Sequence, residues 1–260
     1  MSQRGHAVTL YAGEGSQPPE GGDLIVSSSE LALANRFDFD HYDAVLDTSH
    51  GHWLSKACPS APVLNRLADL ECVWQPPNVV TNSPFMKARK GGRLVNTGIR
   101  PPANDWFNQQ PRQRIALFMS GSPTHKGQHT AATACTLAGW ELNVQYWLPA
   151  DLKWEALAMA AVLLHPSTID AAPRLPLEAA MVGTPTICLN QDGAAYHVAD
   201  QVTGFVCATV GEMVEVLSLG KLNRINPYTC REWADDEHGY EDAVAAYEAL
   251  LTGLTRGERW

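Results

Sequence analysis

The sequence has no long apolar run and few charged residues. No stretch reaches the roughly 20 apolar residues of a membrane-spanning helix, and the opening MSQR leads into no apolar signal region. We therefore expect a cytoplasmic protein. Charged residues make up 18% of the 260 residues, and the formal net charge is -9. Binding to nucleic acid cannot rest on this overall charge and would need a local basic patch.

Cysteine is sparse and scattered along the chain. The six cysteines are Cys58, Cys72, Cys135, Cys188, Cys207 and Cys230, without a CxxC pair or a nearby histidine at metal-binding spacing. This pattern argues against a disulfide framework and against a zinc site. We expect buried free thiols and no bound metal.

The most informative stretch is residues 161–206, which begins AVLLHPSTID. Its first four residues are typical of a buried strand in a parallel sheet. A loop over 166–175 follows, then a helix beginning at Pro176, and a second strand over 186–189. Such a unit places its loop at the carboxyl end of a strand, where α/β proteins hold phosphates and nucleotides.

Two carboxylates, Asp170 and Glu178, bracket this loop with seven residues between them. Each could accept hydrogen bonds from adjacent hydroxyls of a sugar nucleotide. In the alternative, structural interpretation, Asp170 caps a turn and Glu178 complements the helix dipole. Two residues at one spacing do not decide between these roles, because short motifs also occur by chance.

The order and spacing of the whole stretch resemble the signature of the retaining family 4 glycosyltransferases of GT-B fold. That signature has a Glu, seven residues, a second Glu, an Ala-Met helix, Gly-x-Pro, a strand, a Gly-containing loop and a Thr-Gly-Phe-Val-like turn. Asp170 stands at the first Glu and Glu178 at the second. The resemblance implies that Asp170 binds the sugar hydroxyls and Glu178 the ribose of a nucleotide sugar, with Arg174 and Leu175 also at the nucleotide.

A second loop suited to a diphosphate follows the strand predicted over 115–119. It reads SGSPTHKG, residues 120–127, and precedes a helix predicted over 128–138 with Gly139 as its stop. Backbone N–H groups of a loop rich in Gly and Ser can approach a diphosphate closely. Gly121 and Ser122 are therefore candidate binding residues.

Lys126 in this loop supplies a positive charge for the diphosphate. The loop resembles the one that ends in Lys-Gly in the family. Gly121 takes the place of an Arg that the family carries five residues before the Lys, and Arg174 is the candidate to compensate. The alternative is that Lys126 is a surface lysine in a loop that caps a helix.

The resemblance implies an α/β protein of two Rossmann-like domains that face a cleft, with the first domain shortened. Length and 45% hydrophobic content agree with two domains. We predict an acceptor-side domain over 1–105, a nucleotide-sugar-binding domain over 106–235 and a helix over 236–260 that packs back across the cleft. Further expected elements are strands at 7–11, 42–46, 63–64, 78–81, 94–95 and 142–147, and helices at 83–90 and 151–160.

Three polar residues of the first domain are candidates for the cleft. His50 and His52 follow the strand that ends at Asp47, and we expect them in a loop. They are either acid, base or sugar-binding groups or only polar loop residues. Asp69 follows Ala68 where the family has a His-Asp pair, and it stays a candidate contact for sugar or acceptor.

A local basic cluster surrounds two glycines near residue 91. It consists of Lys87, Arg89, Lys90 and Arg93. Basic residues are common at the exposed end of a helix, where they complement its dipole. The alternative is that the cluster binds an anionic acceptor, such as a DNA backbone or a lipid phosphate.

These observations predict a metal-independent glycosyltransferase that moves a hexose to a hydroxyl acceptor with retention of configuration. The expected donor is UDP-glucose, and we expect no cofactor besides the donor. The acceptor stays open between a small molecule, a lipid, a protein and DNA; a phage-type enzyme would modify a hydroxymethylated DNA base or a virion protein in the host cytoplasm. A different function, suggested by Ala68 and Gly121, is nucleotide-sugar binding without catalysis.

Overall fold

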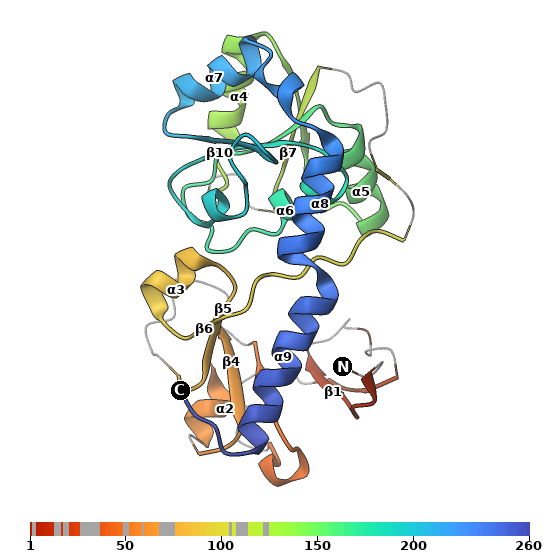
Figure 1. Ribbon diagram of the computed structural model, residues 1–260, viewed down its shortest axis with the longest axis vertical. Helices are drawn as coiled ribbons and strands as arrows, with labels where there is room; N and C mark the ends of the chain where they lie inside the picture. The colour runs from red at the N-terminus through yellow and green to blue at the C-terminus, as the bar shows by residue number, and fades with distance from the viewer. Residues whose placement is uncertain are drawn as a thin grey trace. The chain divides into compact units, whose positions relative to one another are not determined.

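The computed structural model describes residues 1, 4–12, 17, 21–26, 37–48, 52–58, 60–67, 76–103, 106–107, 114–121 and 125–260. The chain forms two compact units, each with parallel strands (Figure 1). The first comprises Met1–Asn82, Lys90–Val95 and Val244–Trp260, and the second comprises Ser83–Arg89 and Asn96–Ala243. The units are interleaved in the sequence, and the three continuous domains expected from the sequence stay a prediction.

The first unit is built on a four-stranded parallel sheet. Its strand order is β3 (Val45–Asp47), β4 (Val63–Leu67), β5 (Val79–Thr81) and β6 (Arg93–Leu94). The other elements of this unit are β1 (Thr9–Ala12) paired in parallel with β2 (Asp23–Val26), the short 3-10 helix η2 (Phe39–His41), and α2 (Trp53–Ala57).

The core of the first unit lies between this sheet and the last helix, α9 (Tyr240–Thr255). Leu64 and Val80 of the sheet are fully buried there, and Leu254 of α9 is 1% exposed. Tyr247 and Leu251 pack against the same cluster. Tyr247, Leu251 and Leu254 are spaced three or four residues apart and therefore form an apolar stripe along one face of α9.

The second unit contains a five-stranded parallel sheet. Its order is β11 (Gly204–Cys207), β10 (Thr186–Leu189), β9 (Val162–His165), β7 (Ile115–Met119) and β8 (Glu141–Gln145). The chain starts at β7, adds β8 on one side, and then crosses to add β9, β10 and β11 on the other. The order therefore reverses between β7 and β9, and ligands of open α/β sheets bind at such a reversal.

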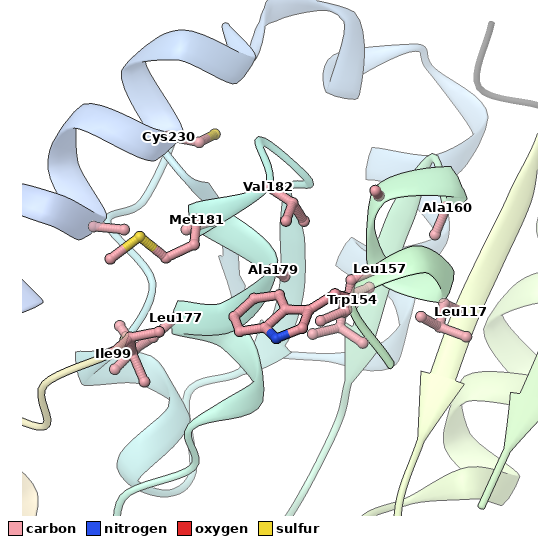
Figure 2. Packing of buried hydrophobic residues seen from close by; sticks show 14 of the residues in the cluster. Ile99, Leu117, Trp154, Leu157, Ala160, Leu177, Ala179, Met181, Val182 and Cys230 are labelled. Carbon is pink, nitrogen blue, oxygen red and sulfur yellow. The ribbon is translucent and has the colours of Figure 1, made fainter. Parts of the chain in front are cut away.

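Helices cover both faces of this second sheet. One face packs on α4 (Gln128–Ala138) and α7 (Val210–Ser218). The other packs on α5 (Ala150–Met159), α6 (Leu175–Met181) and α8 (Pro227–His238). Figure 2 shows this second cluster, which contains Trp154 and Leu157 of α5 and Leu177 of α6. Burial on both faces explains why β7, β9 and β10 are apolar runs without alternation.

Most elements of the second unit agree with the sequence predictions. The strand over 115–119 and the helix over 128–138 are confirmed, and Gly139 ends that helix at φ 68°, in the left-handed region that favours glycine. In the first unit the strand predicted over 42–46 begins only at Val45, and η2 over 39–41 lies shortly before it. No element expected from the sequence corresponds to β2 or α2 in this unit, or to β11, α7 or α8 in the second unit.

Among the described helices, none has both the length and the apolar composition that crossing a membrane would require.

Candidate functional site

Two loops of the second unit meet at the point where the strand order reverses. Lys126, in the loop after β7, forms an ion pair through its Nζ with Oδ2 of Asp170, in the loop after β9. The last residue of β9, His165, lies beside them, with its Nε2 at 3.4 Å from the same carboxylate oxygen. A lysine, a carboxylate and a buried imidazole are thus gathered at the carboxyl end of the sheet.

The environment of Asp170 keeps its carboxylate charged. Burial raises the pKa of Asp170, but hydrogen bonding and charge attraction from His165 and then from Lys126 outweigh it, so that the pKa is lowered from 3.8. Asp170 is therefore an anion at neutral pH that accepts hydrogen bonds and cannot donate them.

Close backbone contacts hold the two loops together. A Cβ on Gly127, which has φ 78°, would overlap the carbonyl oxygen of Pro166 in the opposite loop. The backbone N–H of Thr168 donates to the carbonyl of His125 at 3.4 Å. Ser83, immediately before α3 (Pro84–Lys90), donates from Oγ to the carbonyl of Ala171 at 2.6 Å. The position of Asp170 relative to Lys126 is therefore set by backbone packing as well as by charge.

The loop after β10 supports the Asp170 loop from its other side. Gly193 donates its N–H to the carbonyl of Asp170 at 2.7 Å, and a Cβ on Gly193 would overlap the carbonyl oxygen of Ala171.

Asp192 accepts from the N–H of Ala194 at 2.8 Å at the start of the short helix η3 (Gly193–Tyr196). Burial raises the pKa of Asp192 despite that hydrogen bond. His197 contacts the carbonyl of Pro173 through Nδ1 at 2.7 Å.

Glu178 lies in a second ion pair of the same region. Glu178 is 4% exposed, and its Oε1 lies 2.8 Å from Nζ of Lys153 in the first turn of α5. The guanidinium of Arg174 is 3.6 Å from the same oxygen, and its side chain is 60% exposed. Arg174 therefore combines a contact to Glu178 with an exposed positive charge, whereas Leu175 begins α6 and packs against the core.

The remaining candidates from the sequence fall elsewhere. His50, Asp69 and Ser122 lie outside the described residues, and no structural statement applies to them. His52 belongs to the first unit, where it precedes α2 and is 1% exposed. Gly121 directly follows Ser120 at the end of β7 and is exposed.

The basic residues near position 91 have contacts of their own. The guanidinium of Arg89 lies over the ring of Phe85, 3.6 Å from its centroid. Arg93 lies over the ring of Trp260 at 4.0 Å and is 3.6 Å from a carboxylate oxygen of Glu258. These contacts fit exposed side chains at helix and strand ends, and binding of an anionic acceptor stays a prediction.

A hollow of about 240 Å³ occurs at the opposite end of α6 from the Asp170 loop. It is lined by Pro102, Ala103, Trp106, Phe107, Met181, Val182 and Arg231. Because Met181 and Val182 end α6 whereas the Asp170 loop precedes it, this hollow is separate from the paired loops. Within the described ranges, no three His, Cys, Asp or Glu residues are grouped as metal ligands.

Comparison with known proteins places this geometry in a fold. Residues 107–216, which include both paired loops, match the family model "Glycosyl transferases group 1". No curated protein matches the chain by sequence. Among solved structures, AviGT4, a glycosyltransferase involved in avilamycin A biosynthesis, matches with a TM-score of 0.78 at 20% identity, covering 100% of this chain and 88% of that one. The protein has the GT-B fold.

Two further solved structures agree with this assignment. Sucrose-phosphate synthase from Thermosynechococcus elongatus matches with a TM-score of 0.79 at 13% identity, covering 99% of this chain and 91% of its own. HepE from Anabaena, solved in complex with UDP-glucose, matches with a TM-score of 0.71 at 15% identity, covering 96% of this chain and 100% of that one. The α/β class and the GT-B fold expected from the sequence are therefore confirmed.

Two partners of the carboxylates in this GT-B protein were not predicted from the sequence. Lys153 lies 25 residues before Glu178, on a separate helix, and nothing local to it indicates the pairing. His165 offered a signal, because a polar residue that ends an apolar strand lies at the edge where ligands bind.

Proposed function

We propose that this GT-B protein is a glycosyltransferase that moves a hexose from a nucleotide sugar to a hydroxyl acceptor. The observation that carries the proposal is the meeting of Lys126 and Asp170 at the reversal of strand order, within the segment that matches the glycosyl transferase model. UDP-glucose is the first donor to test, because the structural neighbour HepE was solved with UDP-glucose.

Each charged group has a part in binding the donor. Lys126 attracts the diphosphate, helped by the exposed guanidinium of Arg174. Asp170 accepts hydrogen bonds from sugar hydroxyls, and Glu178 accepts them from the ribose. Lys126 neutralises Asp170 and Lys153 neutralises Glu178. A bound donor would add its diphosphate beside Lys126 and hydrogen bonds from its hydroxyls to the two carboxylates.

The transfer step follows from this arrangement. The acceptor oxygen forms a bond to the anomeric carbon while the bond from that carbon to the diphosphate oxygen breaks, with retention of configuration. The electron pair goes to the departing nucleoside diphosphate, which also takes the acceptor proton. Lys126 and Arg174 would stabilise the charge that develops on the diphosphate, the role that preorganised cations have in other enzymes, and they would do so without a metal ion.

A donor screen tests the proposal. Purified protein is incubated with radiolabelled nucleotide hexoses, UDP-glucose first, and with small-molecule, lipid, protein and hydroxymethylated-DNA acceptors, and the released nucleoside diphosphate and labelled product are measured. Transfer by the wild type and its loss in Lys126→Met would support the proposal. Lys221→Met is the matched control, because Lys221 also pairs with a carboxylate, Glu215, on the exposed surface. Absence of both binding and transfer for every donor would overturn it.

Binding without turnover is the second candidate function, and Gly121 favours it. Gly121 provides no side chain for the diphosphate, and the space beside it is occupied by the ring of Trp147. Calorimetry separates the two functions: a protein that binds a nucleotide sugar with micromolar affinity but produces no product with any acceptor would be a sensor or carrier. Transfer with any acceptor would exclude that function.

A further inference from the structure

An exposed tryptophan stands at the edge of the paired loops. Trp147 follows β8 at the carboxyl end of the sheet and is 81% exposed. Its backbone has φ 50°, in the left-handed region that non-glycine residues rarely adopt. A large apolar side chain held in an unfavourable conformation and left in water lowers stability, and such outliers concentrate at functional sites.

Both sequence neighbours of Trp147 are anchored to other parts of the second unit. The hydroxyl of Tyr146 donates to Oε1 of Gln128 at 2.6 Å, which connects the end of β8 to the first residue of α4. Leu148 packs into the core that α5 and α6 share. With both neighbours anchored, the backbone of Trp147 has a set position at the surface.

One side of the indole lies directly against Gly121. A Cβ built on Gly121 would be 2.6 Å from Cη2 and 2.8 Å from Cε2 of Trp147, so that a side chain at this position would have to displace the indole. The indole thus occupies the space into which a longer residue at 121 would extend. Because the side chain is 81% exposed, much of the rest of the ring is open to solvent.

The strand order sets where Trp147 would lie along a bound donor. Asp170 follows β9, Lys126 follows β7 and Trp147 follows β8, and these strands are adjacent in that order. With the sugar at Asp170 and the diphosphate at Lys126, the nucleoside extends toward Trp147. Three residues after Trp147 begins α5, whose Lys153 holds the proposed ribose ligand Glu178. Ribose and nucleobase therefore belong at the same junction.

We propose that the exposed indole of Trp147 stacks on the nucleobase of the donor. Gly121 is required because the absence of a side chain there leaves room for that ring. This inference rests on the proposed function. Stacking on an aromatic ring is available to every base because every base has a π-face. Trp147 would accordingly contribute affinity for nucleoside diphosphates in general, and the choice of base would depend on other contacts.

Calorimetry with four probes tests this role: UDP, ADP, GDP and inorganic pyrophosphate. Trp147→Asn removes the ring with a residue that tolerates positive φ, and Trp147→Phe keeps an aromatic ring. Trp147→Asn should weaken the preferred nucleoside diphosphate about tenfold to hundredfold, as loss of one base stack does, and leave pyrophosphate binding unchanged. Trp147→Phe should retain most of the affinity. Tyr228→Ala, at an exposed aromatic residue of α8, is the control.

Gly121→Ala independently tests whether Gly121 leaves room for the indole. It should displace the indole and weaken the same nucleoside diphosphate, and it should add no further loss in the Trp147→Asn background because the obstructing ring is then gone. Wild-type affinity in Trp147→Asn, or equal losses for pyrophosphate and nucleoside diphosphate, would overturn the stacking role while leaving the proposed glycosyltransferase in place. If the wild type bound none of the nucleoside diphosphates, both proposals would fall.

Discussion

At the scale of single residues, the candidate site consists of ion pairs. Lys126 pairs with Asp170 and Lys153 with Glu178. Each pair is partly or largely buried, so removing one partner leaves the other as an unpaired charge in a poorly solvated place. Substitutions that change charge but keep shape therefore separate binding roles from structural roles better than alanine does.

Lys126→Met should lower the rate of transfer strongly. If Lys126 stabilises the charge on the departing diphosphate, its loss should cost about 2 to 4 kcal/mol in transition-state stabilisation, the range for losing one such donor. The measurement is kcat/KM for the donor found in the screen, with thermal unfolding to verify the fold. A variant that turns over like the wild type would contradict the assignment of Lys126.

Asp170→Asn and Glu178→Gln should change the affinities for UDP and UDP-glucose in different ways. Glu178→Gln should weaken UDP and UDP-glucose alike, by about 1.5 to 3 kcal/mol, the usual contribution of a hydrogen bond to a charged group. Asp170→Asn should leave UDP binding intact or tighter, because Lys126 no longer has a competing carboxylate, and should lose the affinity that the sugar adds. Calorimetry with the two ligands decides; equal losses in both variants for both ligands would favour a purely structural role for the carboxylates.

At the scale of elements, the buried His238 at the end of α8 contacts two loops of the same unit. Nδ1 of His238 contacts the carbonyl of Thr97 at 3.1 Å, and the ring of His197 lies 5.4 Å from that of His238. Trp233 packs on the same ring at 5.2 Å. Burial first, and then the charge of His197, lower the pKa of His238 to about 4, although the Thr97 hydrogen bond raises it. The folded protein therefore keeps this imidazole neutral.

The contribution of His238 to stability should consequently fall as the pH is lowered from about 6.5 to about 4, whereas Asp192, whose pKa is raised by burial, acts in the opposite direction. In that window the unfolded chain protonates His238 and the folded chain does not, so protons favour unfolding, by at most about 3 kcal/mol for a shift from 6.5 to about 4. The contribution of Asp170, whose pKa is lowered in the folded protein, is present above its ordinary pKa of 3.8 and is lost only as the pH falls below that value, outside this window. Urea unfolding between pH 7.5 and 4.5 measures the effect.

His238→Asn is the matched variant for this measurement. Its side-chain amide can replace the Nδ1–H donor to Thr97 but does not titrate in this range. The variant should show a flatter dependence of unfolding free energy on pH than the wild type. An unchanged slope would mean that other groups cause the acid sensitivity.

At the scale of the whole molecule, the GT-B fold is compatible with transfer that uses only side-chain charges. We expect activity to persist in EDTA, because Lys126 and Arg174 supply the positive charge that a metal ion would otherwise bring to a diphosphate. The measurement is the transfer rate with EDTA and with added magnesium or manganese. A strict requirement for either ion would contradict the proposed electrostatic role of these residues.

Local patterns in the sequence were enough to identify most strands and helices of the second unit, but not β11, α7 or α8. The apolar run of β7, the helix that ends at Gly139 and the strand–loop–helix order around Asp170 each depend on residues close together in the chain. The match of Asp170 and Glu178 to a known signature then indicated the GT-B fold. The first unit was harder, because β2 and η2 are short and their sequences contain no distinctive period.

The sequence by itself determined which charged residues lie in loops at the carboxyl ends of strands, because strand and helix periods are local. Only the tertiary structure decided which of them meet. Lys126 and Asp170 are 44 residues apart, and the order β9–β7–β8 brings their loops, and that of Trp147, to one edge. From the sequence, the resemblance to the family implies only that Gly121 stands where the family has an arginine. The packed structure shows an indole in that space, because a contact between distant residues depends on how the sheet is assembled.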